Sequence, residues 1–123
     1  MSYAERAVAL HQAGSNCAQS VLGSCCKQFH LDAETAYRLG AFFGGGMRMG
    51  ETCGAVTGAL MALGLQFGDQ NNRQSLASRQ FLQSFQTQFG SLQCRELLQK
   101  GPKSEICPAL IRFSAQYVEE HCK

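Results

Sequence analysis

The sequence lacks tryptophan, has only two prolines, and contains no run in which Val, Ile and Thr alternate with polar residues. Alternating β-branched runs are typical of half-buried strands, so their absence argues against a sheet. Apolar residues recur instead at helical spacing, as Tyr3, Ala7 and Leu10 do near the start of the chain. We therefore predict an all-α fold, a single-domain bundle of about six helices over residues 1–123.

The sequence also lacks a basic stripe, a long apolar segment and a secretory leader. Its 11 basic residues are scattered among 9 acidic ones, so we expect no nucleic-acid partner. The longest apolar run, about 13 residues from Cys53 to Leu65, is shorter than the roughly 20 residues of a membrane-spanning helix, so no membrane association is expected. No basic segment followed by an apolar one opens the chain, which favours a cytoplasmic location.

Capping residues and glycines indicate where the helices begin and end. Ser15 or Asn16 can cap one helix and Asp32 another, and Gly90 can close a long one. The predicted helices cover residues 2–13, 16–29, 33–43, 51–67, 73–89 and 105 onward, with a short helix over 91–99.

Seven cysteines in 123 residues are the most informative feature of the composition. The odd count fits a secreted disulfide scaffold poorly, and cysteine density in a reducing compartment indicates metal binding or thiol chemistry. First-turn positions, where the helix dipole stabilises an anion, are predicted for Cys17, Cys53, Cys94 and Cys107. Within a helix or at the C-terminus lie Cys25, Cys26 and Cys122, which we interpret as core or surface filler.

A glycine-rich loop precedes the helix predicted to start at residue 51. Its backbone can enter conformations with positive φ and approach another group closely. We predict that this region helps to hold a cofactor through Gly44, Gly45, Gly46, Arg48, Gly50 and Gly54. The loop lacks the Gly-Lys-Ser/Thr ending of a phosphate loop, so nucleotide binding is not expected.

Cys53 follows this loop and is predicted to be the most acidic thiol of the chain. A helix N-terminus lowers a thiol pKa, and Arg48 is either a cationic neighbour of Cys53 or a solvated side chain. Small residues recur every fourth position after it, and this stripe suits either an internal contact or a homodimer interface. The histidines at 11 and 121 have no companions and are interpreted as surface residues, and the pairing of Cys26 with His30 as coincidence.

Residues 53–58 read Cys-Gly-Ala-Val-Thr-Gly, and residues 16–21 read Asn-Cys-Ala-Gln-Ser-Val. With the glycine loop, these segments resemble a family of small redox-active proteins defined by four cysteines and a C-G-A-x-x-G motif. The resemblance spans nearly the whole chain, places the other two family cysteines on Cys94 and Cys107, and implies a helical domain with a redox or metal role. A more distant likeness to the cysteine-bearing part of split-Soret cytochromes implies an iron–sulfur cluster. No C-x-x-C-H haem-attachment motif is present, so the likeness to these cytochromes does not imply that the chain binds haem.

Three functions remain open from the sequence. The leading hypothesis is a redox protein with an unidentified redox partner, whose four first-turn cysteines bind an iron–sulfur cluster, slightly preferred, or cycle between thiol and disulfide. The alternative is a structural site of four cysteines around zinc. The third is a helical interaction module with inert cysteines.

Overall fold

The computed structural model describes residues 1–122, and the side chains of 72–74 lie outside the description. The helices are α1 (Tyr3–Gln12), α2 (Cys17–Cys25), α3 (Ala33–Gly40), α4 (Gly54–Phe67), α5 (Asn71–Phe89), α6 (Cys94–Leu97) and α7 (Lys103–His121). A 3₁₀ turn extends α2 to Phe29. The described residues contain no strand, only an isolated bridge between Thr52 and Gln93, so the prediction of an all-α fold is confirmed.

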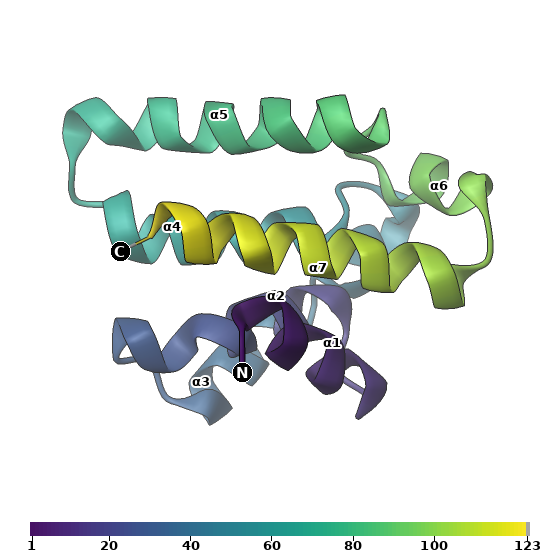
Figure 1. The fold of residues 1–123 in the computed structure, drawn as a ribbon, viewed down its shortest axis with the longest axis horizontal. Coiled ribbons are helices and arrows are strands. Elements are labelled where there is room, and N and C mark those ends of the chain that lie inside the picture. Colours follow the sequence, from purple (N-terminus) through teal and green to yellow (C-terminus); the bar gives the residue numbers. More distant parts are fainter. Residues whose placement is uncertain (123) are drawn as a thin grey trace.

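The helices surround one apolar core. Figure 1 shows α5 along one side of α4 and α7, with α1, α2 and α3 on the other side. Phe81 and Phe85 of α5 are fully buried and pack in a cluster with Leu22 of α2 and Ile111 of α7. No helix in residues 1–122 combines the length and the apolar composition needed to cross a membrane.

α3 ends at Gly40, three residues before the predicted end, because the side chain of Asn16, the cap residue of α2, hydrogen-bonds to the carbonyl groups at this point. Asn16 Nδ2 donates to the carbonyl oxygens of Gly40 at 3.1 Å and Ala41 at 3.3 Å. Gly40 itself packs so closely on α2 that a Cβ there would lie 2.9 Å from the backbone nitrogen of Gln19. The boundary is therefore set by a tertiary contact, which the local sequence does not encode.

α4 and α6 both begin later than predicted, and for one shared reason. The Cys53 N–H donates to the Leu92 carbonyl at 2.8 Å, and the Cys94 N–H donates to the Glu51 carbonyl at 2.6 Å. These two bonds hold residues 51–53 and 92–94 extended against each other. Both segments turn into helices only after leaving this pairing.

The small residues of α4 serve an internal contact with α2. A Cβ on Gly58 would lie 2.8 Å from the Ala18 carbonyl oxygen and 3.1 Å from Val21 Cβ. A Cβ on Gly54 would lie 3.0 Å from Cys17 Cβ. The homodimer interface considered for this stripe remains a prediction, but at Gly54 and Gly58 the stripe packs against α2.

Gly58→Ala should destabilise the fold by ~1–3 kcal/mol, because the added methyl group must displace α2 from α4. Gly64→Ala on the same helix is the matched control, since its Cβ would meet nothing within 4 Å. It should stabilise α4 by roughly 0.5–1 kcal/mol through helix propensity alone. Urea unfolding measures both free energies, and equal effects of the two substitutions would contradict the close packing of α2 on α4.

Candidate functional site: a cavity lined by four cysteines

Four helices bring the four predicted cysteines to a single cavity of about 70 Å³. The cysteines that line it are Cys17, Cys53, Cys94 and Cys107. The three cysteines interpreted as filler lie elsewhere: Cys25, Cys26 and Cys122 are buried in the apolar core. Cys122, at the C-terminus, packs in the core and not at the surface, because only 8% of it is exposed. The structure thus separates the cysteines as the sequence did.

Cys17 is the first residue of α2, and a capping box fixes it there. The Asn16 side chain accepts a hydrogen bond from the Gln19 N–H at 2.8 Å, and the Gln19 side chain accepts one from the Asn16 N–H at 2.9 Å. Since Asn16 also donates to carbonyl groups at the end of α3, the same side chain positions α2 against α3. The polar residues Asn16 and Gln19 of the 16–21 motif therefore fix the position of Cys17.

Cys53 and Cys94 are placed by the backbone pairing of 51–53 with 92–94 and by a glycine that permits it. Gly46 has φ of 63°, and a Cβ there would lie 2.6 Å from the Glu51 nitrogen and 2.7 Å from Cys94 Cβ. Arg95 closes the same junction, with Nη2 2.6 Å from Glu51 Oε1. Only a glycine fits at position 46 without moving Cys94.

The cysteines do not all occupy first helical turns. Cys17 and Cys94 are the first residues of α2 and α6, and Cys53 is the cap residue before α4. Cys107 is wrongly predicted, because α7 begins at Lys103 and puts Cys107 in the second turn. The four sulfurs therefore share a cavity rather than one type of helix end.

The residues predicted to hold a cofactor have different positions relative to the cavity. Gly45 and Gly54 line it. Gly44 lies against the Asn16 side chain, Gly46 against Cys94, and Gly50 has φ of 70° beside Arg95. Arg48 is exposed, and its Nη2 donates to the Ala41 carbonyl at 3.2 Å. Close packing of the loop accounts for Gly44 and Gly46, while a role of these residues toward a cofactor remains a prediction.

The Cys17 and Cys107 thiols interact within the cavity. Their interaction lowers the pKa of Cys107 to about 7. Lys103, one helical turn before Cys107, lowers that pKa further through its positive charge. The interaction with Cys107, together with burial, raises the pKa of Cys17 well above its usual value. Near neutral pH a large fraction of Cys107 is therefore thiolate, while Cys17 remains a thiol.

Cys53 is not the acidic thiol that its position before α4 suggests. Burial raises its pKa to about 11, although the backbone N–H groups of Ala55 and Val56 act in the opposite direction. The residue is only 2% exposed. Of the two roles considered for Arg48, the structure fits the solvated one, since Arg48 is exposed and donates to the Ala41 carbonyl. Desolvation therefore outweighs the helix terminus at this sulfur.

Two cavity residues, Lys103 and His11, were missed or misread from the sequence. Lys103 lies four positions before Cys107, a spacing that puts both on one helix face and could have been noticed. His11 was interpreted as a surface residue, but it is half-buried and lines the cavity. Its Nδ1 lies 3.0 Å from the Ser15 carbonyl oxygen, so Nδ1 carries the proton and Nε2 is the nitrogen able to accept one.

The donors around the cavity do not form a ready metal site. All seven cysteines are free thiols. Across residues 1–122, no group of three or more His, Cys, Asp or Glu side chains is arranged to hold one metal ion. A tetrahedral Cys₄ site requires sulfur ligands about 2.3 Å from one zinc ion. The present arrangement therefore fits a thiol pair, and neither zinc nor an iron–sulfur cluster fits without movement of the side chains.

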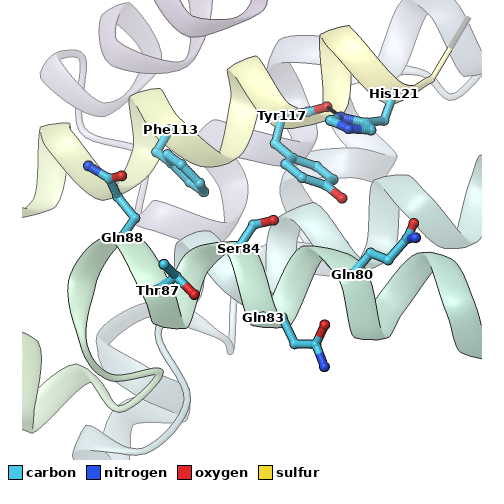
Figure 2. A pocket seen from close by; sticks show the side chains of 8 residues that line it. All are labelled: Gln80, Gln83, Ser84, Thr87, Gln88, Phe113, Tyr117 and His121. Atoms are coloured by element: carbon cyan, nitrogen blue, oxygen red, sulfur yellow. Dashed lines mark hydrogen bonds between the residues drawn. The ribbon is translucent and has the colours of Figure 1, made fainter.

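A second hollow lies between α5 and α7 and has a different character (Figure 2). Amide and hydroxyl side chains of α5 face Phe113, Tyr117 and His121 of α7 across it. The Tyr117 and His121 rings stack at 3.8 Å between centroids. No cysteine lines this groove, so the thiol chemistry belongs to the smaller cavity.

The fold and the cavity define a class: an all-α protein whose four separate cysteines meet at one small site. Residues 15–121 match the family model described as "Putative redox-active protein (C_GCAxxG_C_C)", and the chain belongs to that family. No curated protein and no solved structure matches the chain. His11 precedes the matched segment, so the family model does not include it.

In fully reduced protein, alkylation of Cys107 by iodoacetamide should reach half its maximal rate near pH 7, because the thiolate is the reactive form. Cys53 should require a pH near 11. Cys17→Ala removes the thiol whose interaction lowers the Cys107 pKa and should raise the Cys107 midpoint, whereas Cys122→Ala, at a core cysteine outside the cavity, should leave it unchanged. Mass mapping of the labelled peptides measures each midpoint. A Cys107 midpoint unaffected by Cys17→Ala would contradict the paired thiols.

Proposed function

We propose that this protein is a dithiol–disulfide redox protein in which Cys17 and Cys107 are the reacting pair. The observation that carries the proposal is that the Cys17 and Cys107 thiols line one cavity and lie close enough there to shift each other's pKa in opposite directions. A thiolate beside a thiol is the reactive form of such a pair, since the thiolate is the nucleophile in disulfide exchange. Membership of the redox-active family supports the same class of function.

The proposed reaction oxidises both thiols and forms one S–S bond. The Cys107 thiolate attacks an external oxidant and forms a covalent bond to it. Cys17 then attacks the Cys107 sulfur and displaces the bound part of the oxidant, so that the pair loses two protons and the oxidant accepts two electrons. α2 and α7, which carry the two cysteines, pack against each other. Closure of the bond therefore needs movement of side chains rather than a change of fold.

Cys53 and Cys94 play a supporting part in this proposal. Negative charge on either would raise the pKa of Cys17, which lines the same cavity. Burial raises the pKa of both, so they stay protonated at neutral pH. They leave the single negative charge on Cys107. We further propose that the protein works in the cytosol, where reducing conditions return the pair to thiols, with a redox partner still to be identified.

An iron–sulfur cluster is the second candidate, because four thiols around one cavity are the ligand number that a cluster needs. The side chains would have to move closer together to bind it. A structural zinc site meets the same obstacle. The dithiol function needs only two sulfurs, and those two already interact.

A redox titration of the purified protein with peptide mapping should show the loss of two thiols and a disulfide that joins Cys17 to Cys107. Cys107→Ser should abolish this disulfide, while the matched variant Cys122→Ser, outside the cavity, should retain it. Loss of no thiols under mild oxidation, or a disulfide between other cysteines, would refute the proposed pair.

Chelation separates the dithiol function from the metal-based alternatives. A dithiol protein should keep its helical circular dichroism and its unfolding midpoint in a strong chelator, because no metal contributes to folding. Elemental analysis of protein purified without air should find substoichiometric iron and zinc. Stoichiometric iron with visible absorption would favour the cluster, and collapse of the helical signal on chelation would favour structural zinc.

A further inference from the structure

The cysteine cavity is small and its reactive sulfur is barely exposed. Its volume, counted over the positions open to the centre of a water molecule, is about 70 Å³, which is room for a few waters. Cys107 is 4% exposed and Cys53 is 2% exposed. A reactant must therefore enter the cavity to reach the Cys107 sulfur.

We propose that the oxidant of the Cys17–Cys107 pair is a small peroxide, of which hydrogen peroxide is the simplest, and not a protein or peptide disulfide. This inference rests on the proposed dithiol function and names its substrate class. A peroxide of two oxygen atoms fits the space, whereas the attacked sulfur of a disulfide carries a second sulfur and two carbon chains. Leu98 and Leu110 form apolar walls that such chains would have to displace.

The charges around the cavity suit this reaction. Lys103 lies at the wall close enough to Cys107 to favour its thiolate, and the same positive charge would stabilise the hydroxide that leaves when the O–O bond breaks. Cys17 lines the same cavity and interacts with Cys107, so the oxidised sulfur forms beside the thiol that consumes it. The nucleophile, a stabilising cation and the second thiol thus meet in one place.

The chemistry balances in two steps. In the first, the Cys107 thiolate attacks one peroxide oxygen, an S–O bond forms, the O–O bond breaks, and the departing hydroxide takes up the proton that Cys107 had released. In the second, Cys17 attacks the Cys107 sulfenic acid, an S–S bond forms, the S–O bond breaks, and the Cys17 proton leaves with the hydroxyl group as water. Two thiols are oxidised, and one hydrogen peroxide is reduced to two waters.

The test compares hydrogen peroxide with oxidised glutathione in single-turnover oxidation of the reduced protein. Each rate of Cys17–Cys107 disulfide formation is divided by the rate at which the same oxidant reacts with an unstructured cysteine peptide. This ratio corrects for the different reactivities of the two oxidants toward an accessible thiol. The normalised rate should favour hydrogen peroxide by at least about tenfold, because access limits the larger oxidant. Equal normalised rates, or a faster reaction with oxidised glutathione, would overturn the proposal.

A cavity variant tests the size argument directly. Leu98→Ala enlarges the cavity. It should raise the normalised rate with oxidised glutathione and change the rate with hydrogen peroxide little. Leu82→Ala truncates a half-buried leucine of α5 away from the cavity and is the matched control. An unchanged ratio in Leu98→Ala would count against exclusion by size. If no oxidant forms the Cys17–Cys107 disulfide, the dithiol function itself fails, whereas oxidation by glutathione disulfide alone refutes only the small-oxidant inference.

Discussion

The site depends on how closely backbones approach one another at two glycines. Gly54 lets the start of α4 meet Cys17, and Gly46 lets the loop before α4 meet Cys94. A Cβ at position 46 would lie 2.7 Å from Cys94 Cβ, closer than Cβ atoms essentially ever come, and a Cβ at position 54 would lie 3.0 Å from Cys17 Cβ, tighter than the great majority of such contacts. Three of the four sulfurs therefore meet because two residues have no side chain.

The balance between burial and helix termini decides which thiol is reactive. A helix N-terminus contributes ~0.3–1 kcal/mol at an exposed site and up to ~2 kcal/mol when partly buried, and one pKa unit corresponds to 1.36 kcal/mol, so a terminus alone changes a thiol pKa by at most about 1.5 units. Burial is the larger effect at Cys53 and raises its pKa to about 11. The pKa of Cys107 is lowered instead, through its interaction with the Cys17 thiol and the positive charge of Lys103. The reactivity of each thiol in this cavity thus depends on the groups around it rather than on its position in a helix.

Local features of the chain were predictable from the sequence, and tertiary ones were not. The caps at Asn16 and Asp32 and the stop at Gly90 are encoded by the residues themselves, and the structure confirms all three. The ends of α3 and the starts of α4 and α6 were predicted wrongly, because hydrogen bonds between distant segments set them. His11 was misread for the same reason: only the packing of α1 onto α2 and α7 brings it to the cavity.

Cysteine ¹³Cβ chemical shifts test the central claim most directly, because they report the oxidation state of every sulfur in one sample. In protein labelled at cysteine and oxidised under mild conditions, only Cys17 and Cys107 should move to values typical of a disulfide, and both should return on reduction. Shifts of Cys53 and Cys94 in their place, or no change at any cysteine, would contradict the assignment of Cys17 and Cys107 as the redox pair.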